Sequence, residues 1–194
     1  NAGGSGNSAD MVAGVEYAAI IGADVANLSF GGMMGTVDPA LVEACRFAYE
    51  HGVALIAASG NEGTEGVASP ASSPYTLAVG SFNSHRERSW FTNYGTGLDV
   101  LAAGGDATSD GWSMTYTEVI WSTWVRSVYE AESLGVEPGT HAISGEAGTS
   151  MAAPQAAGLA ALIKSLCPDI SPDSVYNIIR NTAQDVGTPG WDPQ

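Results

Sequence analysis

Lysine is nearly absent from this chain. The 194 residues include one lysine and five arginines against 21 acidic residues, and the net charge is −15. Nucleic acids and anionic membrane surfaces repel a chain of this charge, so we exclude both as partners. The acidic surface either serves solubility alone or adapts the protein to high salt, where counterions screen the repulsion between carboxylates.

Cysteine and long apolar runs are also scarce. Cys45 and Cys167 are too few for a disulfide framework. Their apolar neighbours predict buried free thiols, with a single disulfide as the alternative. No apolar run reaches the roughly 20 residues that a membrane-spanning helix needs. A hydrophobic fraction of 44% and 25 glycines instead predict one compact, turn-rich domain over residues 1–194.

Apolar residues alternate between helix-like and strand-like patterns along the chain. Their spacing predicts helices over residues 9–21, 39–50, 152–166 and 172–182. Short apolar runs predict strands over residues 24–29, 53–58, 76–80 and 98–101. The alternation predicts an α/β fold with a doubly wound, mostly parallel sheet. Residues 103–147 break this pattern and predict an irregular stretch, with a strand over 118–124 and a short helix or surface excursion over 125–134.

A serine precedes the longest apolar helix. Ser150 follows Gly148 and Thr149, and the run from residue 152 to 166 comes directly after it. Backbone N–H groups at a helix N-terminus lack intrahelical acceptors and favour negative charge, so a hydroxyl there is well placed as a nucleophile. We place Pro154 in the first turn, where its missing N–H costs little. The alternative for Ser150 or Thr149 is a simple N-cap.

Three segments match one protein family in order and spacing. Gly148–Pro154 resembles the nucleophile motif of the subtilisin-like serine proteases, the subtilases. Residues 27–32 resemble the family's substrate-binding strand end, and residues 57–63 resemble the segment that carries its oxyanion-hole asparagine. The resemblance covers nearly the whole chain except residues 105–117 and 125–140, which look like insertions. Gln155 stands where the family usually has histidine, and we expect only a packing change from it.

The resemblance implies a serine endopeptidase that forms an acyl-enzyme on Ser150. The backbone N–H of Ser150 and the side-chain amide of Asn61 would hold the oxyanion. For Asn61 alone, a turn residue beside glycine is the alternative.

The resemblance also implies how a peptide or protein substrate binds. An extended peptide would lie as an added strand between two edge segments, Gly4-Ser5-Gly6 and Ser29-Phe30-Gly31. The S1 pocket would be walled by Ser29, Phe30, Gly31, Ala58, Ser59 and Gly60, with Ala68 near its base. No carboxylate is evident at that base, which favours a bulky apolar P1 residue. Glu62 and Glu65 at the rim leave a basic P1 residue as the alternative.

A serine protease of this family also needs an aspartate and a histidine, which the family carries in an Asp-Thr/Ser-Gly and a His-Gly-Thr motif, and neither motif is present in this sequence. The family carries both upstream, so we expect the chain to be roughly the C-terminal two thirds of a catalytic domain, incomplete at both ends. An upstream segment or chain would supply the aspartate and histidine, and this chain alone should show little turnover. His51 and His85 are predicted to be packing or solvated residues, and His141 is the only one placed near Ser150, in the preceding loop.

Two alternatives and three accessory expectations remain. A non-catalytic peptide-binding pseudoprotease is the second hypothesis, whereas a generic α/β hydrolase is disfavoured because Ser150 has no Gly-x-Ser-x-Gly elbow. The histidines and cysteines lack the spacing of a metal site, so we predict none. No cofactor is required, although the family resemblance suggests structural calcium at carbonyls of residues 71–74. Family resemblance alone implies an extracellular location.

Overall fold

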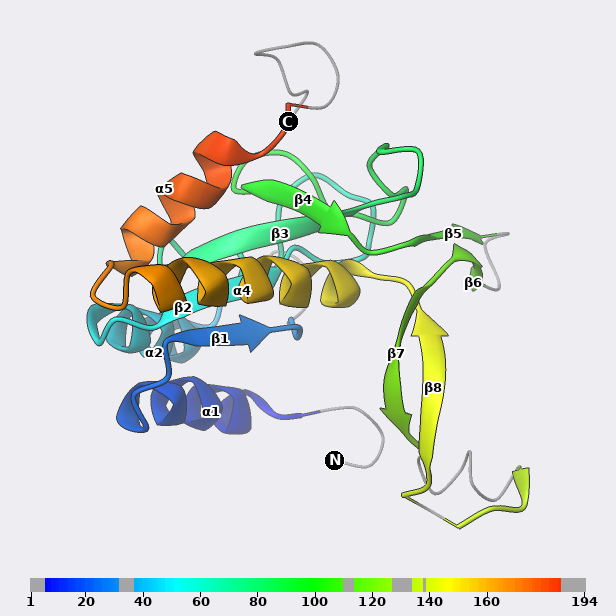
Figure 1. Cartoon of the computed structure of the whole chain (residues 1–194), viewed down its shortest axis with the longest axis horizontal. Coiled ribbons are helices and arrows are strands. Elements are labelled where there is room, and N and C mark those ends of the chain that lie inside the picture. Colours follow the sequence, from blue (N-terminus) through cyan, green and yellow to red (C-terminus); the bar gives the residue numbers. More distant parts are fainter. Residues whose placement is uncertain (1–5, 32–36, 110–113, 127–133, 138, 186–194) are drawn as a thin grey trace.

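A computed structural model describes residues 6–31, 37–109, 114–126, 134–137 and 139–185 of the chain. The first half contains α1 (Ser8–Ile20), β1 (Val25–Leu28), α2 (Pro39–Glu50), β2 (Ala54–Ala58), β3 (Thr76–Phe82) and β4 (Val100–Ala103). The second half contains β5 (Asp106–Ser109), β6 (Met114–Glu118), β7 (Ile120–Val125), β8 (His141–Glu146), α4 (Thr149–Leu166) and α5 (Pro172–Thr182). The predicted order of the four helices and the four strands 24–29, 53–58, 76–80 and 98–101 is confirmed, whereas β5, β6 and β8 were not predicted (Figure 1).

The central sheet is parallel, as predicted. Its four strands lie in the order β1-β2-β3-β4, and every pairing is parallel. Parallel pairing brings the carboxyl ends of all four strands to one edge, which is the side where ligands bind in open α/β sheets. The sheet therefore defines where a site is expected.

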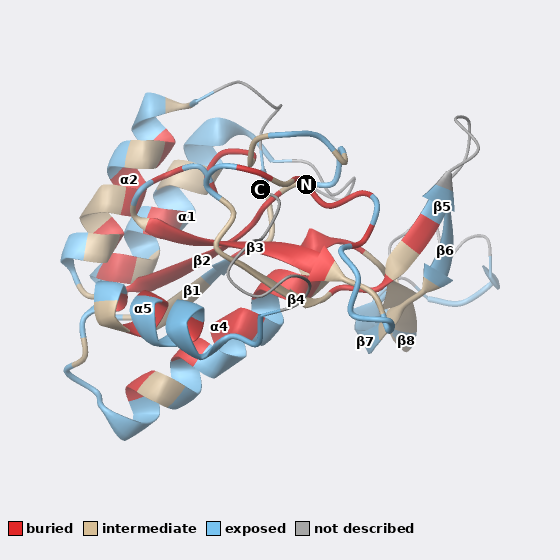
Figure 2. Cartoon of the chain, turned by 90° about the horizontal axis from the view of Figure 1, so that it is seen from above, coloured by how far each residue is buried: buried red, intermediate tan, exposed pale blue. Residues whose placement is uncertain are grey.

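Helices cover both faces of this sheet. Ala54, Ile56 and Ala58 of β2 point into a core shared with α4 and α5. Leu55 and Ala57 point the other way, into a core shared with α1 and α2. Every residue of β2 is buried, because a strand covered on both faces has no polar side (Figure 2). The doubly wound α/β class is thus confirmed.

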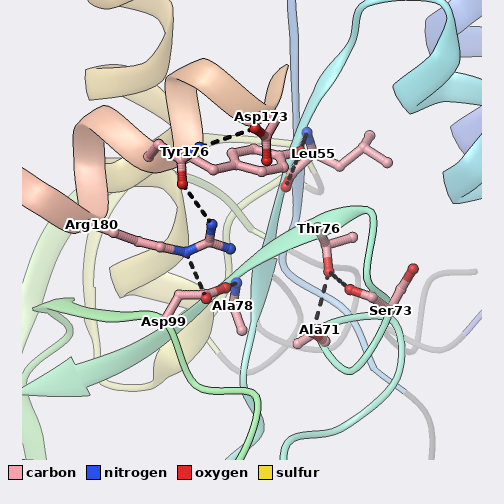
Figure 3. A network of polar contacts seen from close by, with 10 residues as sticks. Leu55, Ala71, Ser73, Thr76, Ala78, Asp99, Asp173, Tyr176 and Arg180 are labelled. Atoms are coloured by element: carbon pink, nitrogen blue, oxygen red, sulfur yellow. Dashed lines mark hydrogen bonds and ion pairs between the residues drawn. The ribbon is translucent and has the colours of Figure 1, made fainter. Parts of the chain in front are cut away.

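Polar contacts tie α5 to the sheet. The Tyr176 hydroxyl accepts a hydrogen bond from the N–H of Leu55 at 2.7 Å and lies 3.1 Å from the Leu55 carbonyl oxygen. Arg180 Nε donates to Asp99 Oδ1 at 2.8 Å, while Asp99 Oδ2 accepts from the N–H of Ala78 at 2.7 Å (Figure 3). These bonds hold the C-terminal helix against β2 and β3.

The position predicted for Pro154 is wrong. The helix α4 begins at Thr149, three residues before the apolar run, so Pro154 lies inside the helix rather than in its first turn. The apolar pattern could not reveal this start, because Gly148 and Thr149 are buried without being large and apolar. A proline at this position cannot donate to the carbonyl of Ser150, four residues earlier.

Residues 103–147 form extra strands outside the central sheet. The strands β5 and β6 pair antiparallel, and so do β7 and β8. Figure 1 shows both pairs beyond the end of β4, away from the helices. The strand predicted over 118–124 is divided, since β6 ends at Glu118 and β7 begins at Ile120. Most of the excursion predicted over 125–134 lies outside the described residues.

The cysteines match their prediction only in part. Both are free thiols, so the single-disulfide alternative is not realised. Cys45 is buried, and burial raises the pKa of its thiol to about 11. Cys167 is exposed, because α4 ends at Leu166 and the chain turns at the surface. None of the helices in the described ranges has the length and apolar character to cross a membrane.

Candidate active site

Three loops meet at the carboxyl edge of the sheet. Ser29 follows β1, and residues 59–61 follow β2. Gly148, which precedes α4, donates its N–H to the carbonyl of Gly104 at 2.8 Å, just beyond β4. The N-terminus of α4 is thereby held over the strand ends.

Ser150 is bound to Ser29 through two contacts. Its Oγ donates to the Ser29 carbonyl oxygen at 3.4 Å, and its own carbonyl accepts from Ser29 Oγ at 2.9 Å. The second bond uses the carbonyl that Pro154 leaves without a helical donor. Ser150 is half-buried and is the second residue of α4, where its backbone N–H has no acceptor within the helix.

Thr149 orients the carboxamide of Asn61. The backbone N–H and the hydroxyl of Thr149 each donate to Asn61 Oδ1 at 2.9 Å. Thr149 is fully buried, and its Oγ1 also accepts from the N–H of Gly60 at 3.3 Å. Because the oxygen end of the carboxamide is bound in this way, its NH₂ end is the end that can donate to a substrate.

The structure bears on two alternatives, namely that Ser150 or Thr149 is a simple N-cap and that Asn61 is a turn residue. The N-cap of α4 is Gly148, with no side-chain capping bond, so neither Ser150 nor Thr149 acts as a cap. Among the described residues, Arg86 is the only non-glycine with positive φ, so Asn61 is not a left-handed turn residue. Thr149 in particular was missed by sequence reasoning, because its partner Asn61 is 88 residues away.

The predicted pocket segments also adjoin one another. A Cβ placed on Gly31 would lie 3.6 Å from Ala68 Cβ and 3.3 Å from the carbonyl oxygen of Ser69. The N–H of Ala68 donates to the carbonyl of Ser59 at 2.8 Å. Gly31, Ser59 and Ala68 are thus brought together at the end of β1 and β2. Phe30 is half-buried and packs against the core beneath α1 and α2.

The first predicted edge segment is only partly described. Gly4 and Ser5 lie outside the described residues, whereas Gly6 is exposed and lies just before Asn7, the N-cap of α1. Gln155 donates to the carbonyl of Ala103 at the end of β4, a packing contact of the kind predicted.

The three histidines lie apart from Ser150. His51 ends α2, and its Nδ1 lies 2.8 Å from the carbonyl oxygen of Phe47. His85 is exposed in the turn after β3. The loop position predicted for His141 is wrong, because this residue begins β8 and pairs with Val125. Roughly 20 Å of extended chain then separates it from Gly148, so it is no candidate base.

A metal site needs several donor side chains close together. Within the described ranges, no group of three or more His, Cys, Asp or Glu side chains is placed to hold an ion. The carbonyl oxygens of Ala71 and Ser73 lie 3.2 and 3.0 Å from the Thr76 hydroxyl (Figure 3). These carbonyl oxygens bind the Thr76 hydroxyl, and structural calcium at residues 71–74 stays a prediction.

Comparison with known proteins places this geometry in a family. A model of the subtilase family matches residues 1–194. Subtilisin DY from Bacillus licheniformis is 35% identical over 191 residues, which cover 96% of this chain and 59% of that protein. Subtilisin Savinase from Lederbergia lenta is 33% identical over 187 residues, with the same two shares.

Solved structures agree with the sequence comparison. A protease from Pseudoalteromonas arctica superposes with a TM-score of 0.80 at 28% identity, over 93% of this chain and 53% of that one. A lanthipeptide protease gives a TM-score of 0.77 at 25% identity, over 97% and 63%. This chain therefore spans less than two thirds of the length of these relatives.

Proposed function

Because this chain belongs to the subtilase family, as its motifs predicted, we propose that it is the nucleophile-bearing part of a serine endopeptidase. The observation that carries the proposal is the bonding of the Asn61 carboxamide to Thr149, the residue directly before Ser150, at the N-terminus of α4. A nucleophile and an amide donor at one helix end are the parts that acyl transfer needs.

The proposed reaction proceeds in two halves. Ser150 Oγ attacks the scissile carbonyl while a base takes its proton, and the carbonyl oxygen becomes an oxyanion. The N–H of Ser150 and the NH₂ of Asn61 donate to this oxyanion, whose negative charge the N-terminus of α4 also favours. The intermediate collapses to an acyl-enzyme as the amine leaves with the proton. Water then attacks the ester by the same route and releases the acid.

The base would come from an upstream segment that carries the histidine and aspartate. Two observations support such a partner. The strand β1 ends the described sheet order, so one of its edges has no strand partner among the described residues. Large apolar side chains are exposed on the helices beside it, including Ile20 of α1 and Leu162 of α4, at 72% and 65%. A further strand and its covering elements would bury this surface.

The proposed substrate is an extended peptide beside Ser29–Gly31, with its P1 side chain between Gly31, Ser59 and Ala68. The small side chains there leave room for a bulky apolar P1 residue. Glu62 at the rim is bound by the amide of Asn93 at 2.6 Å, and it supports the alternative of a basic P1 residue. This chemistry needs no cofactor, and an extracellular location remains a proposal from the family.

Peptide hydrolysis by the full-length protein tests this function. We expect cleavage of an internal amide bond by the wild type and none by Ser150→Ala at matched folding. A pseudoprotease would bind the same peptide without cleaving it. Binding without cleavage by the wild type would therefore establish the alternative and overturn the proposal.

A further inference from the structure

Asn93 is a fully buried polar residue next to the candidate site. It lies between β3 and β4, and sequence reasoning gave it no role. Its Oδ1 accepts hydrogen bonds from the N–H groups of Glu62 and Thr64, at 3.0 and 3.3 Å. Its Nδ2 donates to the carbonyl of Ser59 at 3.2 Å and to Glu62 Oε2 at 2.6 Å. One carboxamide thus binds residues on both sides of Asn61.

The backbone of Asn93 reinforces the same contact. Its N–H donates to the carbonyl of Gly60 at 3.1 Å, and its carbonyl accepts from Ser59 Oγ at 3.4 Å. The fit at Gly60 is close, because a Cβ there would lie 2.2 Å from Asn93 Nδ2. Gly60 also has a φ of 108°, a conformation that favours glycine. Residues 59–64 are therefore shaped around Asn93.

We propose that Asn93 is a positioning residue, which fixes the 59–64 loop so that Asn61 presents its amide to the oxyanion. Thr149 binds the side chain of Asn61, and Asn93 binds the backbone on either side of it. An oxyanion donor stabilises the transition state only if it is already in place when charge develops. A shift of about 1 Å in such a group can cost about 100-fold in rate. This inference rests on the proposed endopeptidase function.

Another asparagine of the same segment provides a matched control. The Oδ1 of Asn83 accepts from the N–H groups of His85 and Glu87, at 3.0 and 3.1 Å. Its Nδ2 donates to the carboxylate of Asp106 at 2.9 Å. Asn83 thus organises a different turn with the same kinds of bond as Asn93. Loss of its carboxamide reports the cost of deleting an asparagine that organises a turn, although Asn83 is only half-buried whereas Asn93 is fully buried.

A double-mutant cycle in the full-length protein tests the role of Asn93. We expect Asn93→Ala to lower kcat for peptide hydrolysis by about 10- to 100-fold, with KM changed by less than about twofold. In an Asn61→Ala background the same change should cost less than about twofold, because the donor it positions is gone. Asn83→Ala should leave kcat within about twofold in both backgrounds. An equal loss from Asn93→Ala in both backgrounds would overturn the proposal.

The Asn93–Glu62 bond allows a second, independent readout. Asn93→Asp keeps the acceptor for the two N–H groups but sets a carboxylate against that of Glu62. Adding Glu62→Gln restores a donor between the two side chains, so we expect the double variant to recover kcat by about tenfold over Asn93→Asp. Absence of any recovery would count against the proposal. If Asn93→Ala fails to fold, Asn93→Ser in the same cycle decides the matter.

Failure of the function and failure of this role give different results. A wild-type protein that neither hydrolyses peptides nor reacts at Ser150 overturns the proposed function, and the role of Asn93 with it. An active wild type with additive losses in the cycle overturns the role of Asn93 alone.

Discussion

The hydroxyl of Ser29 donates a 2.9 Å hydrogen bond to the carbonyl of Ser150. This bond joins the end of β1 to the first turn of α4, across 121 residues of sequence. Pro154, four residues after Ser150, has no N–H to donate to the same carbonyl, so the Ser29 hydroxyl binds a carbonyl that lacks its usual helical donor. The proline thus leaves the nucleophile's backbone available to the strand end that we propose to bind substrate.

Substitution at Ser29 and Pro154 tests this relationship. Ser29→Ala removes the side-chain donor to the Ser150 carbonyl and should lower the free energy of unfolding by about 1 kcal/mol, since Ser150 is half-buried. Pro154→Ala supplies a helical N–H, so the same Ser29→Ala change should then cost less. Denaturant unfolding of the four proteins measures both costs. Equal costs in the two backgrounds would show that the two donors do not compete.

Asn61→Ala removes one of the two proposed oxyanion donors. We expect kcat to fall by about 10²- to 10³-fold with little change in KM, the loss known for the asparagine donor of a subtilisin. Asn177→Ala is the control, because Asn177 lies on α5. Its hydrogen bonds to Asp173 and Arg180 are both exposed. Steady-state kinetics on a peptide amide gives both constants. A change confined to KM would mean that Asn61 binds substrate and transition state equally.

Tyr176→Phe should destabilise the fold by about 1–3 kcal/mol, because it leaves the buried N–H of Leu55 without its acceptor. Tyr17→Phe is the control, since Tyr17 is 61% exposed. Burial also raises the pKa of the Tyr176 hydroxyl above its ordinary value. Its contribution is therefore complete below about pH 10 and is lost as the pH rises above that value.

Stability against pH separates the two effects of Tyr176. The free energy of unfolding of the wild type should fall between about pH 10 and pH 12, and this fall should be smaller in Tyr176→Phe. Identical slopes in the two proteins would contradict the raised pKa of the buried hydroxyl.

Salt should stabilise this acidic protein. The net charge of −15 produces repulsion that 1 M salt screens to a range of about 3 Å. We expect Tm to rise between low salt and molar NaCl. An equal rise for a neutral osmolyte at the same osmolality would remove the electrostatic explanation, and a flat or falling Tm would contradict adaptation to high salt.

Sequence periodicity predicted the central sheet and its helices well. The strand β2 illustrates why, since a short, continuous run of apolar residues from Val53 to Ala58 is typical of a strand covered on both faces. The start of α4 was predicted less well. Its first residues are small or polar, and their burial comes from contacts with Gly104 and Asn61 rather than from an apolar pattern.

Motifs in the sequence pointed to individual candidate residues of the site but not to the contacts between them. Motifs identified Ser150 and Asn61, because each lies in a short segment with a recognisable pattern. Thr149 and Asn93 act through partners 88 and 31 residues away, and no local pattern records such contacts. The prediction for His141 failed for a different reason. Its closeness to Ser150 in sequence suggested closeness in space, but His141 begins the extended strand β8, which separates it from Ser150.

The most direct measurement of the central claim is covalent labelling of the full-length protein with a fluorophosphonate, followed by peptide mass spectrometry. The account predicts one adduct, on Ser150, in the wild type. It predicts none in Ser150→Ala or in unfolded wild type, because an unactivated serine is a poor nucleophile. Absence of an adduct on Ser150 in folded full-length protein would contradict the claim that this serine is the nucleophile of an endopeptidase.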